Sequence, residues 1–484
     1  TIGSYNTAVG QNALRQNTTG GCNTGIGRYA LFNNTTGVNN TAVGEETSYG
    51  NCIGSNNTSI GFRALLCNTA SSITAVGFCA LRNNTTGVQN TALGFQALRD
   101  NTTGGANTAV GYNALALNTS GVANTAIGYS SMIANLTGCR NVATGRSSLR
   151  CNTTGVGNVG LGYYALCSNT TGVQNVTVGN LSMRLNQGGS YNIAMGCGAV
   201  YSNVGGSNNT ALGFKSLFDN TASNNTAIGL ETLRTNTTGS CNVAVGFQAL
   251  RNFNGSSNYA SANVGIGARA LYAATTGVRN VAIGPYALRG LTTGLGNTAV
   301  GSLSQRDVTY GSNNTSLGNQ AGTGNVIGSS NTAIGSYALR NNGASNNTAV
   351  GFNALCSNTT GTYNTALGFC SLLSNTTGVS NTAIGNQALS SNTTGSSNTA
   401  LGRTALLVNT TGTYNTAVGS NSLSCNTTGV SNTALGYSSL RCNTTGGNNT
   451  ALGYQALFCN TTAADNTAVG KCSLFANTTG SNNV

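Results

Sequence analysis

The sequence repeats with a period of 17 residues. The first two copies read NTAVGQNALRQNTTGGC at residues 6–22 and NTGIGRYALFNNTTGVN at 23–39, and about 28 complete copies fit between Asn6 and Asn483. Three copies, from Asn57, Asn209 and Asn331, are one residue short in the turn, and the copy from Asn242 carries four extra residues within 252–262. Length changes placed in turns, with the rest kept in phase, are typical of solenoids.

The repeat has a fixed pattern when its positions are numbered 1 to 17 from the Asn of Asn-Thr-Ala. Position 4 is Val, Ile, Leu or Met except at Thr144, position 9 is usually Leu, and positions 3 and 8 are small. Positions 12 to 15 are usually Asn-Thr-Thr-Gly, which is a turn composition. Position 5 is Gly in every complete copy, which indicates a backbone conformation or a close approach that a Cβ would forbid. This series begins with Gly10, Gly27, Gly44, Gly61, Gly77, Gly94 and Gly111.

The length of the repeat selects the fold class. Helix-pair repeats need about 33–47 residues. One turn of a parallel β-solenoid fits instead, with a short strand at Thr-Ala-Val, a Gly corner, a second short segment at Ala-Leu and a wider turn back. Equivalent residues then stack about 4.8 Å apart, so that the repeats form a rod of roughly 130 Å. We predict an all-β chain, one continuous β-solenoid (β-helix or β-roll) over 1–484 with about 28 coils, least regular at 302–330.

A single coil cannot fold alone. Burying one Val and one Leu yields roughly 3–6 kcal/mol, whereas ordering a whole repeat costs on the order of 17–34 kcal/mol of backbone entropy. Only a stack, with Val, Leu and Asn ladders, can be stable. If position 4 points inward, position 3 points outward. The outward column begins with Ala8, Ala42 and Ala75, and it indicates either packing against another chain or a corner that admits only small residues.

The repeat resembles known fibre proteins. Asn-Thr-Ala-Val-Gly followed by x-x-Ala-Leu is similar to the head repeats of trimeric autotransporter adhesins, although those repeats are shorter. Extended by x-x-Asn-Thr-Thr-Gly, the pattern resembles arrays in phage tail-fibre-like and bacterial surface proteins. The resemblance covers nearly the whole chain. It implies a parallel β-roll or β-helix in an elongated extracellular fibre, often trimeric.

Both ends of the chain lack atypical capping repeats. The sequence starts with Thr1-Ile2-Gly3, the remnant of a turn, and ends at Asn482-Asn483-Val484, the start of another copy. Bare end coils expose unpaired strand edges, so we expect either a window on a longer molecule or head-to-tail stacking. The predicted partner is therefore the chain itself, end to end or laterally. No apolar run approaches the roughly 18–20 residues of a membrane span, and the 15 cysteines favour an extracellular, cell-surface or virion-surface location.

Basic residues recur at one position of the repeat. The formal net charge is +13, and two interpretations of the excess stay open. A positive edge could contact acidic polysaccharide, lipopolysaccharide or another polyanion, or it could keep the rod soluble and discourage edge pairing. No nucleic-acid-binding motif accompanies it. The arginines at position 10 are Arg15, Arg82, Arg99, Arg150, Arg184, Arg234, Arg251, Arg289, Arg306, Arg340 and Arg441.

Two further patterns have a functional and a structural interpretation. Asn-x-Ser/Thr sequons recur in most copies and predict either glycan acceptors or simple turn chemistry. The cysteines of three consecutive copies, Cys425, Cys442 and Cys459, share position 11 within disulfide range, yet an odd column cannot pair completely, and small apolar filling is the favoured role. The candidate acceptors include Asn17, Asn34, Asn84, Asn101, Asn152, Asn358 and Asn443.

The residue inventory argues against catalysis. The chain has no His, and its only adjacent acids are Glu45 and Glu46, so nucleophile–base pairs and carboxylate dyads lack parts. No CxxC pair occurs, and seven acids are too few for calcium-binding repeats. The Thr-Thr pairs lie in turns, which argues against an ice-binding face. We predict no enzyme, cofactor or metal. The expected function is a structural fibre, and the alternative is an adhesin that binds acidic glycans.

Overall fold

The computed structural model describes residues 3–255 and 261–484, so the predicted insertion at 252–262 lies partly outside the described residues. The chain divides into two compact units, Thr1–Ser240 and Cys241–Val484. Each repeat contributes one three-residue strand, and the described residues contain no helix. Each unit is a parallel β-solenoid, which confirms the predicted fold class. We call one repeat a coil.

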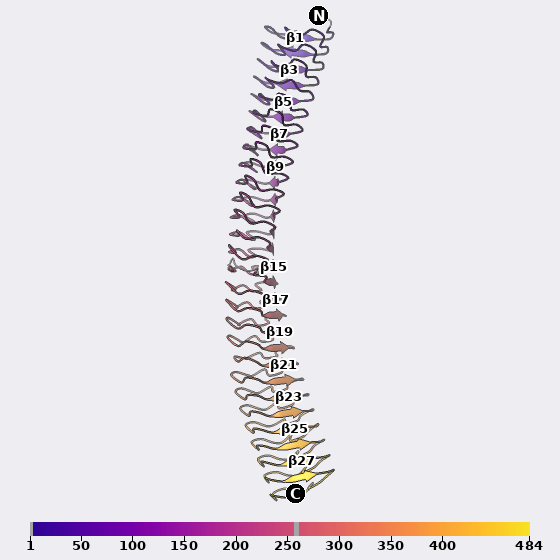
Figure 1. The fold of residues 1–484 in the computed structure, drawn as a ribbon, viewed down its shortest axis with the longest axis vertical. Helices are drawn as coiled ribbons and strands as arrows, with labels where there is room; N and C mark the ends of the chain where they lie inside the picture. Colours follow the sequence, from indigo (N-terminus) through magenta and orange to yellow (C-terminus); the bar gives the residue numbers. More distant parts are fainter. Residues whose placement is uncertain (1–2, 256–260) are drawn as a thin grey trace. The chain divides into compact units, whose positions relative to one another are not determined.

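The N-terminal unit stacks its strands in sequence order. Each strand follows the previous one along the stack (Figure 1) and pairs with it in parallel. Equivalent residues face one another, as Thr91 faces Thr108 and Leu93 faces Val110. The strands are β1 (Thr7–Val9), β2 (Thr24–Ile26), β3 (Thr41–Val43), β4 (Thr58–Ile60), β5 (Thr74–Val76), β6 (Thr91–Leu93), β7 (Thr108–Val110), β8 (Thr125–Ile127), β9 (Val142–Thr144), β10 (Val159–Leu161), β11 (Val176–Val178), β12 (Ile193–Met195), β13 (Thr210–Leu212) and β14 (Thr226–Ile228).

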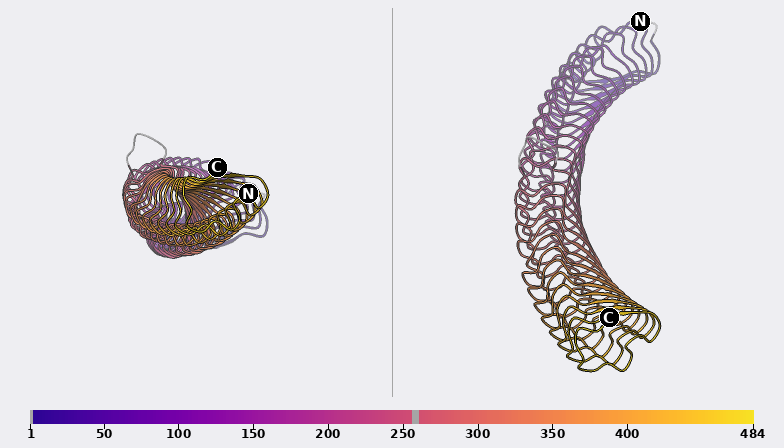
Figure 2. Two further views of the ribbon diagram at one scale, coloured as in Figure 1. Left: turned by 90° about the horizontal axis from the view of Figure 1, so that it is seen from below. Right: turned by 60° about the horizontal axis from the view of Figure 1, so that its bottom comes forward.

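The C-terminal unit repeats this arrangement. Its coils are stacked one after another, as the orange-to-yellow loops of Figure 2 show. They pair in register, as Thr399 faces Thr416 across β24 and β25. The strands are β15 (Val243–Val245), β16 (Val264–Ile266), β17 (Val281–Ile283), β18 (Thr298–Val300), β19 (Thr315–Leu317), β20 (Thr332–Ile334), β21 (Thr348–Val350), β22 (Thr365–Leu367), β23 (Thr382–Ile384), β24 (Thr399–Leu401), β25 (Thr416–Val418), β26 (Thr433–Leu435), β27 (Thr450–Leu452) and β28 (Thr467–Val469).

The core is built from alanine and leucine, and the predicted inward face of the strand was wrong. Position 3 is buried, with Ala42 and Ala75 fully excluded from solvent, whereas position 4 points outward. The space beside position 3 is small. An ideal Cβ on Gly25, which occupies that position, would already lie 3.4 Å from the Ala30 carbonyl oxygen and from Leu14 Cγ. Only small side chains occupy it, mostly Ala, with Ser59, Ser316 and Thr177 as the larger members. The column therefore fills the core and cannot pack against another chain.

The segment after the Gly corner, the second short segment of the prediction, is not a strand. Positions 6 to 11, which we call the return segment, form turns in the described coils. The backbone is left-handed at positions 7, 9 and 17, as at Tyr29 (φ 61°), Leu31 (φ 51°) and Cys22 (φ 59°). Left-handed φ values interrupt an extended strand. The sequence contains the corresponding signal, because β-branched residues, which tolerate φ > 0 poorly, are nearly absent from these positions.

The predicted Asn ladders are present along both units. At position 1, Asn415 donates its backbone N–H and its amide to Asn398 Oδ1, at 3.0 and 3.2 Å. At position 12, Asn409 Nδ2 donates to Asn392 Oδ1 at 2.9 Å and to the Gly412 carbonyl at 3.0 Å. Buried amides that are fully hydrogen-bonded stabilise a core and fix its register.

Residues 302–330 are regular, which corrects the prediction for this stretch. Strand β19 pairs with β18 and β20 in the common register. Two substitutions at position 9 compensate each other. Gly322 leaves the usual leucine volume empty, and the buried Gln305 of the preceding coil donates from Nε2 to Ser316 Oγ at 2.9 Å and to the Thr298 carbonyl at 3.0 Å. The composition of this stretch is unusual, but the fold is not.

Candidate binding edge

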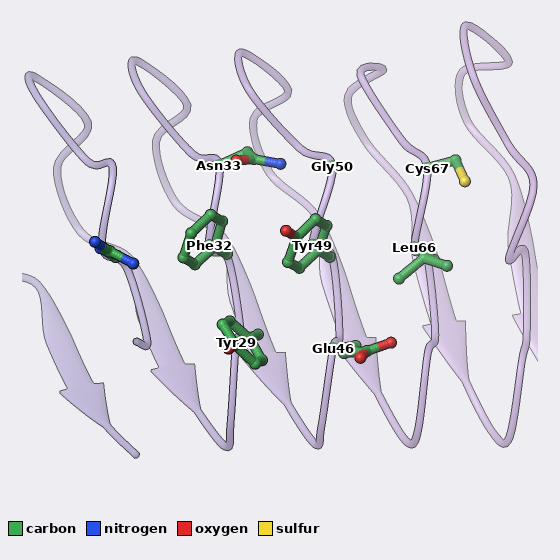
Figure 3. A pocket seen from close by; sticks show the side chains of 9 residues that line it. Tyr29, Phe32, Asn33, Glu46, Tyr49, Gly50, Leu66 and Cys67 are labelled. Carbon is green, nitrogen blue, oxygen red and sulfur yellow. The ribbon is translucent and has the colours of Figure 1, made fainter. Parts of the chain in front are cut away.

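Two shallow pockets lie on the return segments, one in each unit. The larger, of about 710 Å³, is lined by residues at positions 7, 10 and 11 of neighbouring coils, among them Arg15 and Glu46. Figure 3 shows Phe32, Tyr49 and Leu66 in line along successive return segments. The smaller pocket, of about 280 Å³, is lined by Tyr272, Ala273, Arg289, Gly290, Arg306 and Asp307. We call the side chains at positions 7 and 10 the Arg/aromatic edge.

Stacking organises the larger pocket. The rings of Phe32 and Tyr49 are 5.1 Å apart and nearly parallel, and Tyr29 meets Phe32 edge-on at 5.4 Å. The Arg15 guanidinium lies 5.7 Å from the Phe32 ring centre. Axial stacking covers the ring faces, so the pocket offers ring edges and one cation at its rim. This suits a flat or anionic group better than a buried apolar ligand.

The predicted arginine stripe is a mixed column of cations and rings. Several position-10 arginines lie over aromatic rings, such as Arg340 over Tyr337 at 5.2 Å and Arg441 over Phe458 at 5.7 Å. The carboxylate of Asp100 accepts hydrogen bonds from Arg99, which hold its pKa below the ordinary value. Position-10 arginines with carboxylate partners include Arg99 with Asp100, Arg234 with Glu231 and Arg306 with Asp307.

The positive edge is also discontinuous. Within the N-terminal unit Arg82 and Arg99 occupy consecutive coils, and within the C-terminal unit Arg289 and Arg306 do. Between Arg340 and Arg441 position 10 carries no charge. The positive charge at position 10 is therefore divided into short groups of coils. A long polyanion would meet separate basic patches rather than one stripe.

A second aromatic column was missed by the sequence reasoning. Five consecutive coils carry an aromatic at position 6, and neighbouring ring centres are 4.9–5.4 Å apart. The repeated aromatic at a fixed position was a visible signal. Because the rings stack on each other, their edges face solvent, and a sugar ring has no free aromatic face to lie on. The column comprises Phe62, Phe78, Phe95, Tyr112 and Tyr129.

The sequon asparagines serve the position-12 ladder. Asn101 is fully buried, and its Nδ2 donates to Asn84 Oδ1 at 2.7 Å and to the Gly104 carbonyl at 2.9 Å. A glycan on Nδ2 would replace a hydrogen that these bonds use. The folded ladder therefore leaves no room for a glycan at its buried members, Asn34, Asn84, Asn101, Asn152, Asn358 and Asn443, and Asn17 is partly buried in the same ladder.

The thiols lie in different environments, although all of them are free. The buried Cys167 hydrogen-bonds to the exposed Cys151 of the preceding coil, which lowers the pKa of Cys151 to about 6 and raises the pKa of Cys167. Cys442, between Cys425 and Cys459, has a pKa raised by burial and by its two neighbours.

We expect Cys151 to be alkylated by iodoacetamide at neutral pH at least about tenfold faster than Cys442, because the thiolate is the nucleophile. Lowering the pH through the pKa of Cys151, about 6, should slow its alkylation, since the thiol is then protonated. Raising the pH through the raised pKa of Cys442 should narrow the difference between the two sites, since both are then thiolates. Peptide mass spectrometry of a timed reaction measures both sites in one sample. Equal rates at neutral pH would contradict the proposed hydrogen bond.

Residues 3–255 and 261–484 contain no His/Cys/Asp/Glu group that could hold a metal ion and no helix long and apolar enough to cross a membrane. In comparisons with known proteins, no family model matches the chain, and no curated protein matches it significantly.

Proposed function

We propose that this chain is a structural rod, a segment of an extracellular or virion-borne fibre. The observation that carries the proposal is that the repeated hydrogen bonds of the chain run from each coil to the next. Strand pairing, both Asn ladders and the Thr hydroxyls of the turn, such as Thr427 Oγ1 donating to the Thr444 carbonyl at 3.0 Å, all link a position to its equivalent in the next coil. Such a chain gains stability only by extending along one axis.

The chemistry of the surface supports the same proposal. The pockets are shallow and belong to the repeated edge, and their side chains are held by stacking and ion pairs with one another. The chain contains no His. The activated thiol, Cys151, has another thiol, Cys167, as its hydrogen-bond partner, whereas acyl or phosphoryl transfer would need a nucleophile beside a base.

Electron microscopy of the purified chain tests this proposal. We expect unbranched rods with a length of roughly 130 Å per chain, or multiples of it if copies stack end to end. Circular dichroism of the same sample should show β-structure without helix. Compact particles, or a mainly helical spectrum, would contradict the proposal.

The second candidate function is adhesion to acidic surface glycans. It is favoured by the Arg/aromatic edge, where Arg15, Arg340 and Arg441 lie over rings rather than beside carboxylates. Guanidinium groups over rings remain able to bind sulfate or carboxylate groups.

We expect this candidate to show binding to heparin that weakens steeply with salt, because separate basic patches are screened within about 10 Å at moderate ionic strength. Exchanging Arg15, Arg340 and Arg441 for Gln should weaken binding further. The matched control exchanges Arg140, Arg279 and Arg403, which lie at positions 17 and 6, for Gln. Salt-independent binding, or an equal loss in both variants, would remove the candidate.

A further inference from the structure

The outward face of the strands carries no charge. Position 2 is Thr, Val or Ile in every strand, and position 4 is aliphatic except at Thr144. Both columns point away from the core, because position 3 between them is buried. We call these two columns the Thr/aliphatic face. The face spans fourteen strands in each unit, from β1 to β14 and from β15 to β28.

The aliphatic column is accessible to solvent along its whole length, either exposed or half-buried. None of its residues is buried, and sixteen of them are exposed by 36–68%, including Leu367 and Leu401 at 44%. With about 100 Å² of apolar surface per side chain, fourteen coils expose on the order of 600 Å² in each unit. The largest apolar patch of a typical monomer is about 300–600 Å². The Thr methyl groups add to it, so each unit approaches the roughly 800 Å² per partner of a stable interface.

The threonine column has unused hydrogen-bonding capacity. Among the described residues, no Thr hydroxyl at position 2 makes a hydrogen bond within the chain, whereas the Thr hydroxyls at position 13 bond to the next coil. The strand threonines are half-buried or exposed. A partner on this face can therefore gain both apolar contact and hydroxyl hydrogen bonds.

We propose that the Thr/aliphatic face is the interface with a second copy of this chain, sheet against sheet; the inference rests on the proposed function, since only a rod presents so long a face. Each copy carries a net charge of +13, so two copies repel each other. Contact through the uncharged face brings the fewest like charges together. Both copies have the same axial spacing, so their coils can match one another along the whole face, and the same patch can serve on both sides of a two-fold interface. Sheets packed in this way lie about 10 Å apart with interdigitating side chains.

The variable size of position 4 favours a protein partner over ordered water. Along β21 to β24 the outward residue changes from Val350 to Leu367, Ile384 and Leu401. Side chains of unequal length make a corrugated surface, which matches the interdigitated packing of two sheets. A rigid lattice of water molecules would require a flatter face.

A matched pair of variants tests the interface. Leu367→Lys with Leu401→Lys places cations on the Thr/aliphatic face, and Leu373→Lys with Leu407→Lys makes the same exchange in the same two coils at position 10, where eleven coils already carry Arg. Analytical ultracentrifugation of the wild type should show concentration-dependent pairing that sulfate strengthens and sodium chloride does not weaken. The face variant should raise the dimer Kd at least about a hundredfold, because buried lysines lack partners. The position-10 variant should pair nearly as the wild type does.

Further arms of the experiment separate the possible failures. Circular dichroism checks that both variants fold, and if the lysines prevent folding, Leu367→Thr with Leu401→Thr, a residue that position 4 accepts at Thr144, should still weaken pairing about tenfold. Wild-type rods that stay single at every concentration would overturn the inference, and so would an equal effect of both lysine variants. Either result would leave the proposed function, a structural rod, unaffected. Single wild-type rods that shape growing ice crystals would assign the face to ordered water and overturn it too. Compact particles in the micrographs would instead overturn the proposed function.

Discussion

Gly196→Ala is expected to lower the free energy of unfolding by roughly 3–5 kcal/mol. Gly196 is the corner glycine of its coil, with φ +132°, a conformation that L side chains rarely adopt. A Cβ at this position would lie 2.5 Å from the carbonyl oxygen of Gly213, the corner glycine of the next coil. The backbone of Gly213 is itself hydrogen-bonded to a neighbouring coil, so Gly213 cannot move aside without breaking the stack. Urea titration followed by circular dichroism measures the loss.

The same coil contains the control for this prediction. Gly205 lies in the turn, and a Cβ added there would meet nothing within 4 Å. Its φ lies outside the left-handed region, so Gly205→Ala should leave the urea midpoint unchanged or raise it slightly, because alanine restricts the unfolded chain. If the two variants unfold at the same urea concentration, the close packing of the corner glycines does not limit stability.

Asn409→Leu is expected to cost about 2–6 kcal/mol, although leucine has a similar size and is apolar. The exchange leaves Asn392 Oδ1 without its donor at 2.9 Å and leaves one N–H of Asn426 without its acceptor at 2.8 Å. Both atoms are buried. Unsatisfied buried polar groups cost more than the added apolar contact returns. Urea titration again provides the measurement.

A natural interruption of the ladder supplies the comparison for Asn409. Four consecutive coils replace the position-12 Asn with apolar residues, Phe253, Ala274, Leu291 and Val308, and all four are buried. The Asn side chains are replaced in all four consecutive coils, so no amide within this block is left without its hydrogen-bond partner. Asn325 lies at the edge of this block, and its Oδ1 accepts a hydrogen bond from the Gly328 N–H of its own turn at 2.8 Å.

The same exchange at the edge of the block should therefore be milder. Asn325→Leu breaks no amide bond to a neighbouring coil, so we expect a loss of about 1–3 kcal/mol, close to the value for one unsatisfied group. Equal losses at Asn325 and Asn409 would show that the amide ladder contributes nothing beyond each turn.

The period and the corner glycine were sufficient to predict the solenoid, because no other architecture closes within one repeat. The direction of the strand faces was not predictable from alternation. Positions 3 and 4 are both apolar, and alternation only places them on opposite sides. The choice depends on the distance between the strand and the return segment, which admits small side chains such as Ala42 but has no room for the leucines and isoleucines of position 4.

The candidate edge could be predicted only in part. The column of arginines followed from the repeat, but the rings and carboxylates that hold individual arginines depend on side-chain directions in the return segment. Its left-handed residues at positions 7 and 9 set those directions. The scarcity of β-branched residues there was the available signal, with Val200 and Thr404 as exceptions.

The one-residue deletion in the turn of the coil that begins at Asn209 has a mechanical consequence. In this coil Asn220 Nδ2 donates to the Ala222 carbonyl at 2.7 Å, and the buried Asn203 Oδ1 of the preceding coil has no partner. Coils linked end to end carry a pulling force in series, so the weakest junction sets the strength of the whole. Under tension, rupture of the N-terminal unit should begin between these two coils.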